Sequence, residues 1–170
     1  MPKKNIVARL INFGPLFLLY YISISEIDTH FESYFEILSF NLQLIIIYFW
    51  SLKSSTILGN GHIFFVGLIN DVVLGFPLGL SSLTFLTVSL FATYINNMTV
   101  HTTIASDWFT FFLALSLSNI IFYLLIFNFS EISISLKDIS YNTFFTLIFF
   151  PFFWIFFTYY NSFLKVGKNA

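Results

Sequence analysis

The spacing of charged residues is the feature that most limits how this chain can fold. Its 7 basic and 8 acidic residues leave long uncharged stretches, and positions 72–106 contain no Asp, Glu, Lys or Arg. Over its 170 residues the chain is 58% hydrophobic and 9% charged, whereas soluble domains are about 25% charged. A helix needs roughly 20 apolar residues to cross a bilayer. The sequence therefore predicts an integral membrane protein whose single domain covers 1–170.

Charged residues and one turn signal divide the chain into six expected helices. Gly75, Pro77 and Gly79 lie close together in the long uncharged stretch. Because Gly permits positive φ and Pro fixes φ without offering a donor, we place a tight reversal there. The predicted spans are roughly 8–25, 35–52, 61–75, 79–97, 108–129 and 140–164. The expected fold class is all-α, a polytopic six-helix transmembrane bundle.

The basic residues predict the orientation of this bundle. With six spans, Lys137 lies on one side and the other six basic residues lie on the opposite side: Lys3, Lys4, Arg9, Lys53, Lys165 and Lys168. Positively charged loops stay in the cytoplasm, so both termini are expected there, and a count of five spans partitions the charges less well. The first apolar run also imitates a secretory signal with a cleavage site near Ser25.

Composition and missing motifs exclude several function classes. The formal net charge is −1 and no basic stripe is present, so nucleic acid is not an expected partner. The chain has no cysteine, and it lacks the HExxH, GxxxxGK[ST], GxGxxG and GxSxG signatures. We therefore expect a protein that is not an enzyme, with no catalytic residue, no metal and no cofactor.

The most informative polar residue is Asp71, which lies in an apolar stretch. Gly67, Asp71 and Gly75 recur at intervals of four and are expected to share one helix face, with Asn70 beside them. An intramembrane carboxylate can serve as a proton relay or cation ligand, or as a structural acceptor. No basic residue or second carboxylate is expected at its depth, so a structural role is favoured. His62, His101 and Asp107 are expected at span ends, in reach of water, and no chemical role is expected for them.

An acidic segment follows the first predicted span and is a candidate partner-facing outer loop. Its acidic residues are Glu26, Asp28, Glu32 and Glu36. The last three fall on one helical face, so the segment could dock a basic or apolar partner. The alternative is a solvated face without a partner.

The stretch from Gly67 to Leu80 resembles the rod shape-determining protein MreD family. The matching residues, in order, are Gly67, Leu68, Asp71, Gly75, Pro77, Leu78, Gly79 and Leu80. Looser agreement extends to Tyr48, Phe49 and Trp50 before Lys53, to Trp108 and Phe109, and to the six-span plan. The chain departs from the pattern in lacking a proline in the loop after Lys53.

The resemblance implies a non-enzymatic scaffold subunit of the bacterial cell elongation (rod) complex in the inner membrane. Its implied partner is an MreC-like single-pass protein, and through it MreB, RodA and a class B penicillin-binding transpeptidase. It also implies a fold like that of the substrate-binding subunits of energy-coupling-factor vitamin transporters, and such a subunit is the alternative function. Those subunits carry small residues spaced by three on the first helix, whereas here Gly14 is the only small apolar residue after Ala8.

Overall fold

The computed structural model describes residues 13–25, 41–53, 58–98, 103–129 and 136–169, and within these ranges every regular element is a helix. The helices are α2 (Gly14–Ile24), α3 (Leu42–Lys53), α4 (Asn60–Leu74), α5 (Leu80–Met98), α6 (Ile104–Phe129) and α7 (Leu136–Asn169). The prediction of an all-helical protein is confirmed for the described part of the chain.

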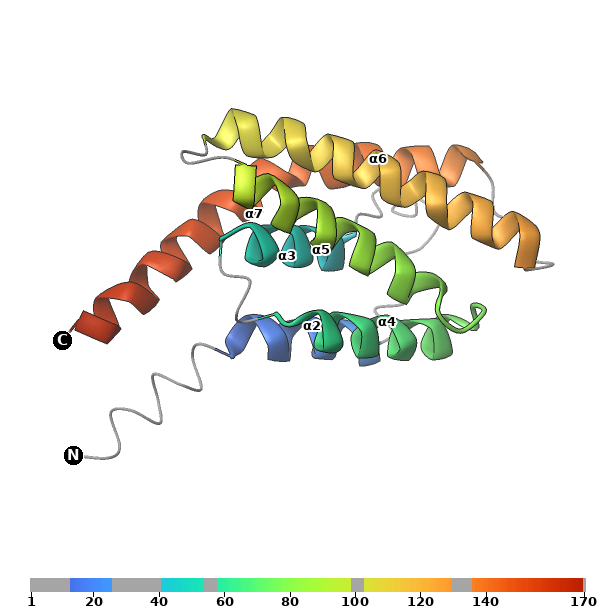
Figure 1. Cartoon of the computed structure of the whole chain (residues 1–170), viewed down its shortest axis with the longest axis horizontal. Helices are drawn as coiled ribbons and strands as arrows, with labels where there is room; N and C mark the ends of the chain where they lie inside the picture. The colour runs from blue at the N-terminus through green and yellow to red at the C-terminus, as the bar shows by residue number, and fades with distance from the viewer. Residues whose placement is uncertain (1–12, 26–40, 54–57, 99–102, 130–135, 170) are drawn as a thin grey trace, which may run out of the picture.

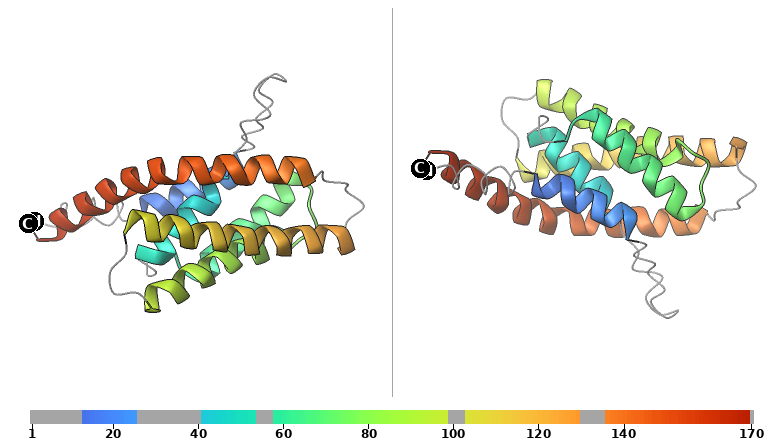
Figure 2. Two further views of the ribbon diagram at one scale, coloured as in Figure 1. Left: turned by 90° about the horizontal axis from the view of Figure 1, so that it is seen from above. Right: turned by 90° about the horizontal axis from the view of Figure 1, so that it is seen from below.

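The helices pack in three layers of two, as Figure 1 shows. Helices α2 and α4 form one outer layer, α3 and α5 the middle, and α6 and α7 the other outer layer. Contacts between layers run from α2 through α3 to α7 and from α4 through α5 to α6. The views in Figure 2 show α6 and α7 side by side, and the C-terminal part of α7 extends past the other helices.

Helix α3 is the centre of the bundle. Residues Gln43 to Leu52 are all buried, although an isolated helix of 12 residues is marginal in water. Packing on several sides therefore holds it, and aromatic rings supply much of that packing. Tyr48 contacts Phe111 and Phe150, and the latter two rings stack with centroids 4.3 Å apart.

Within the described ranges, two helices are long and apolar enough to cross a membrane. They contain the segments Ile104–Asn128 of α6 and Ile139–Ser162 of α7. In an apolar stretch of 18 residues within each segment, only 28% and 17% of the residues are buried inside the molecule, whereas the core helix of a soluble protein is mostly buried. Their outer faces carry large exposed apolar side chains, among them Phe109, Phe127 and Phe152.

The expected helices correspond to the observed ones with shifted ends. Helix α4 ends at Leu74, one residue before the predicted end, and α6 begins at Ile104 instead of 108. The start of α6 is set by Thr103, whose hydroxyl accepts the N–H of Ser106 at 3.3 Å as a helix N-cap. Helix α7 contains Pro151 and continues to Asn169. The predicted starts at 8 and 35 lie outside the described residues.

Candidate functional site

The turn between α4 and α5 is built around Asp71. Its backbone carbonyl accepts the N–H groups of Gly75 and Phe76, the latter at 2.9 Å. Gly75 adopts a left-handed conformation with φ of 68°, which is the usual way for a helix to end at glycine. Gly79 has φ of 98°. The predicted reversal is therefore present, and both glycines supply backbone conformations that other residues adopt at a cost.

The side chain of Asp71 caps the N-terminus of the next helix, α5. Its two carboxylate oxygens accept the backbone N–H groups of Gly79 and Ser81, each at 2.8 Å. The first N–H groups of a helix lack partners within the helix, and Gly79 has no side chain that could accept them. The fully buried Asp71 thus caps α5 from the preceding helix. Among the described residues no basic side chain pairs with it.

Gly67 allows α4 and α5 to pack at close range. A Cβ atom at Gly67 would overlap the backbone of Ser82, and the hydroxyl of Ser82 donates to the carbonyl of Phe64 at 2.9 Å. Gly75 does not share this face, contrary to the expectation from the four-residue interval. It lies beyond the end of α4, where the chain has already left the helical path.

A network of neutral polar side chains joins four helices beside Asp71. Gln43 on α3 donates to Ser23 on α2 at 2.9 Å and to the Asn70 carbonyl on α4 at 3.1 Å. Asn70 in turn donates to Ser81 on α5 at 3.0 Å. Because buried polar groups are costly unless hydrogen-bonded, this network fixes how the four helices fit together.

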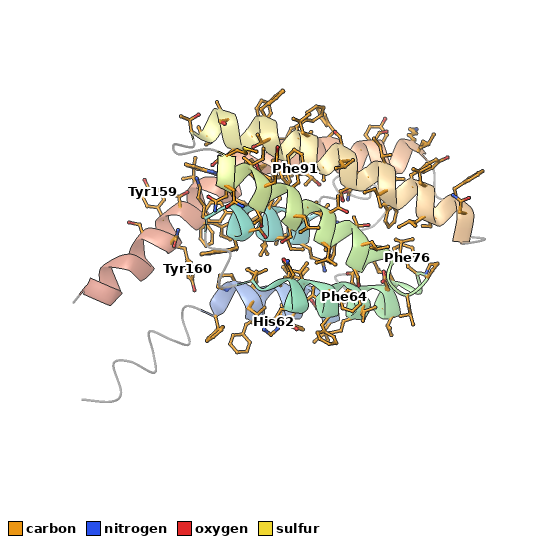
Figure 3. All side chains as sticks on the ribbon, in the orientation of Figure 1. His62, Phe64, Phe76, Phe91, Tyr159 and Tyr160 are labelled. Atoms are coloured by element: carbon orange, nitrogen blue, oxygen red, sulfur yellow. The ribbon has the colours of Figure 1, made fainter. Side chains whose placement is uncertain are left out.

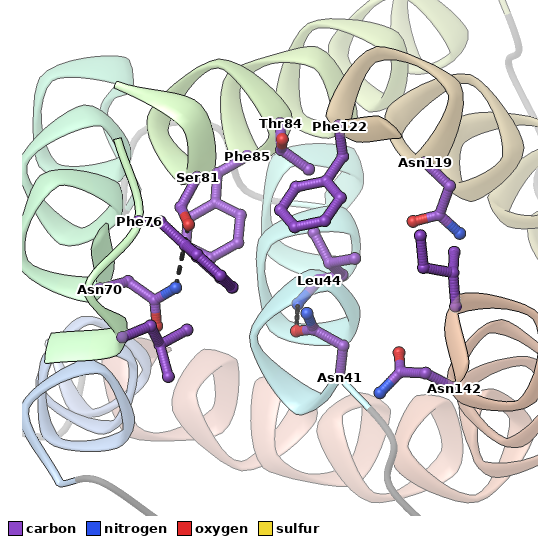
Figure 4. A pocket seen from close by; sticks show the side chains of 12 residues that line it. Asn41, Leu44, Asn70, Phe76, Ser81, Thr84, Phe85, Asn119, Phe122 and Asn142 are labelled. Atoms are coloured by element: carbon purple, nitrogen blue, oxygen red, sulfur yellow. Dashed lines mark hydrogen bonds between the residues drawn. The ribbon is translucent and has the colours of Figure 1, made fainter. Parts of the chain in front are cut away.

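A pocket of about 280 Å³ opens next to this network. Its lining residues are Asn41, Leu44, Asn70, Leu74, Phe76, Ser81, Thr84, Phe85, Asn119, Phe122, Ile139 and Asn142. Figure 4 shows Asn119 and Asn142 on one side of the pocket and Asn70 with Phe76 on the other. The rings of Phe76 and Phe122 meet edge to face with centroids 5.8 Å apart. Among the described residues the lining therefore combines uncharged polar side chains with aromatic and aliphatic ones.

An ion pair between the half-buried Lys53 and the fully buried Asp107 lies at the opposite end of the bundle. Lys53 at the end of α3 approaches the Asp107 carboxylate at the start of α6 to 3.0 Å, and the indole N–H of Trp154 donates to the same oxygen at 2.9 Å. Asp107 is fully buried, and its second carboxylate oxygen has no hydrogen-bond partner among the described residues. The expectation that Asp107 simply meets water is therefore wrong, because α3 and α7 cover it.

The other predicted site residues are placed as follows. His62 is exposed on α4, and its ring nitrogen Nδ1 lies 3.3 Å from the Tyr20 hydroxyl. Pro77 lies inside the α4–α5 turn, where its carbonyl accepts the N–H of Leu80 at 3.2 Å. The acidic residues Glu26, Asp28, Glu32 and Glu36, and also His101, lie outside the described residues. No group of three His, Asp or Glu residues able to hold a metal occurs in the described ranges.

Sequence reasoning missed Gln43, Ser81, Asn119 and Asn142. Each is an ordinary polar residue in an apolar helix, and nothing local separates a pocket-lining amide from a surface one. Of the pocket-lining amides, only Asn70 is marked in the sequence, because it directly precedes Asp71. The position of Lys53 predicts the orientation of the chain in the membrane. Its pairing with Asp107 could not be predicted, because it joins two helices that are distant in the sequence.

Comparisons with known proteins identify no relative of this chain: no family model matches it, and no curated protein or solved structure is significantly similar to it.

Proposed function

We propose that this chain is a non-enzymatic scaffold subunit of the bacterial cell elongation complex, embedded in the inner membrane by six helices with both termini in the cytoplasm. The observation that carries the proposal is the unit formed by Gly67 to Leu80. Gly67 packs against the backbone of Ser82, Asp71 accepts two backbone N–H groups, and Gly75 and Gly79 adopt the positive φ angles of the turn. The stretch that resembles the MreD family therefore serves packing and turn formation, as expected of a subunit whose function is to bind others.

Exposed apolar surface supports the membrane location. Soluble monomers rarely expose large contiguous apolar patches, whereas here Phe127 is 74% exposed and Phe152 is 67% exposed. Phe64 on α4 and Tyr159 on α7, both labelled in Figure 3, are also exposed. The 12 residues of α3 reach about 18 Å at 1.5 Å per residue, which is less than the bilayer core of about 30 Å. The shorter helices α2, α3 and α4 therefore need neighbouring helices around them in the membrane.

The test is purification of the tagged full chain in mild detergent, followed by identification of the proteins that accompany it. Recovery of an MreC-like protein with RodA and a class B penicillin-binding transpeptidase is the expected result. A variant with Glu26, Asp28, Glu32 and Glu36 changed to Gln tests the outer loop as the contact surface, with Glu131→Gln as the matched control. Capture of none of these proteins by the wild-type chain contradicts the scaffold function.

The pocket favours a second candidate, a substrate-binding subunit of an energy-coupling-factor transporter. An open pocket of about 280 Å³ between five helices has room for a small molecule. The same purification separates the two functions. Recovery of a transmembrane coupling subunit with two ATPases, in place of the elongation proteins, assigns the chain to nutrient capture.

A further inference from the structure

The pocket beside the α4–α5 turn collects amide side chains from separate parts of the chain. Asn41 precedes α3, Asn70 belongs to α4, Asn119 to α6 and Asn142 to α7, and all four line the same space. All four side chains are half-buried. The pocket therefore brings together hydrogen-bonding groups from parts of the chain that are separate in the sequence.

Part of this amide set is used by the fold and part is not. Asn70 donates to Ser81 and accepts from Gln43, so its side chain forms a fixed wall. The carbonyl oxygen of Asn41 accepts the N–H of Leu44 at 3.1 Å, and the amide nitrogen of Asn119 donates to Thr143 at 2.6 Å. Within the described part of the chain, the Asn41 amide nitrogen and the Asn119 carbonyl oxygen form no other hydrogen bond.

The remaining walls define what kind of molecule fits. Phe76, Phe85 and Phe122 supply aromatic surface, and no charged side chain lines the pocket among the described residues. Among the described lining residues, a charged ligand would find no opposite charge. The volume of about 280 Å³ lies close to the lower end of the range of about 300–1,000 Å³ that is typical of ligand pockets. This is enough for one ring with a polar substituent.

We propose that this pocket binds an uncharged molecule, or the uncharged head group of a lipid, that carries a hydrogen-bond donor and an acceptor beside a flat apolar face. The Asn119 carbonyl accepts from the ligand and the Asn41 amide donates to it. The phenylalanine rings cover the apolar face. The inference does not rest on the scaffold function, because a scaffold and a capture subunit could each hold such a ligand.

Benzamide and benzoate test this chemistry, since they share a ring and differ in charge. Binding to the full chain in mild detergent is measured by ligand-observed NMR, which detects weak complexes. We expect benzamide to bind at least tenfold more tightly than benzoate. Asn119→Leu should weaken benzamide about tenfold or more, because the ligand N–H then has no acceptor. Asn128→Leu is the matched control, as Asn128 lies on the same helix outside the pocket.

Melting temperatures of both variants establish that they remain folded, and Asn119→Ser replaces Asn119→Leu if the latter does not fold. Native mass spectrometry of the purified chain then distinguishes the two possible ligands, a lipid head group and a free solute. A retained uncharged lipid that Asn119→Leu releases indicates a head group, and benzamide binding without a retained lipid indicates a free solute. Absence of both, equal binding of benzoate, or unchanged binding in the Asn119 variant overturns the proposal. None of these outcomes depends on which proteins co-purify.

Discussion

At the scale of single residues, Asp71 acts on both sides of one turn. Its backbone carbonyl accepts the hydrogen bonds that end α4, and its carboxylate caps α5. Both carboxylate oxygens are occupied by backbone donors, so neither is aimed at the pocket or at a cation. Of the two roles considered for this residue, the contacts are those of a structural acceptor.

Replacement of Asp71 should therefore lower stability in graded steps. Hydrogen bonds to a charged group contribute about 1.5–3 kcal/mol each. Asp71→Ala removes two acceptors and should lower the free energy of unfolding by about 3 kcal/mol or more. Asp71→Asn keeps one carbonyl oxygen and should lose roughly half as much. Titration with sodium dodecyl sulfate in mixed micelles measures the change.

Thr87→Ala serves as the control for Asp71, because the Thr87 hydroxyl donates only to the Leu83 carbonyl of its own helix. Stability equal to wild type in both Asp71 variants would show that the two backbone hydrogen bonds are unimportant. Complete loss of transport in a stable, assembled Asp71→Asn protein would instead favour proton coupling.

Gly67 offers a second test at this scale, with a control in its own helix. Gly67→Ala places a methyl group against the backbone of Ser82, which cannot yield as a flexible side chain can. We expect a loss of about 1–3 kcal/mol, the usual effect of overpacking. Gly61→Ala meets no atom within 4 Å and should be neutral or stabilising by up to about 1 kcal/mol. Equal thermal stability of the two variants would contradict the close packing of α4 and α5.

At the scale of elements, the Lys53–Asp107 pair fixes the end of α3 against the start of α6. Each charge lies at the helix end where the backbone dipole favours it, a cation in the last turn of α3 and an anion in the first turn of α6. Trp154 extends the cluster to α7 through its hydrogen bond to Asp107. Three helices are therefore held together by one carboxylate.

Removal of only the cation should be more harmful than removal of both charges. Lys53→Met leaves Asp107 buried without its ion pair, and because Lys53 is itself partly exposed, we expect a smaller loss than the roughly 3–5 kcal/mol of a fully buried pair. In the double variant Lys53→Met with Asp107→Leu no buried charge remains, so part of this loss should be recovered. Denaturant titration of the wild type and the single and double variants provides the comparison. A double variant less stable than Lys53→Met would contradict this account.

At the scale of the whole molecule, the described helices place the pocket and the ion pair at opposite ends. Lys53 and Asp107 lie where α3 ends and α6 begins. The turn after α4 and the start of α7 border the pocket. In the proposed orientation the ion pair faces the cytoplasm. The pocket then faces the outer side, where the acidic residues of 26–36 are also expected.

Single cysteines test this orientation without background, because the chain has none of its own. Lys137→Cys, at the exposed start of α7, should react with an impermeant maleimide in intact spheroplasts. Asn97→Cys, at the exposed end of α5, should react only after permeabilisation. The opposite pattern would reverse the topology, and labelling of both from outside would contradict the six-span arrangement.

The sequence by itself determined the helical class, the approximate helix positions and the reversal at Gly75 to Gly79. These depend on local properties, namely the absence of charge over long stretches and the φ freedom of glycine. The burial of Asp107, the network through Gln43 and the convergence of Asn41, Asn119 and Asn142 were decided only by the tertiary structure. They join residues from different helices, and a sequence pattern does not specify which faces of those helices meet.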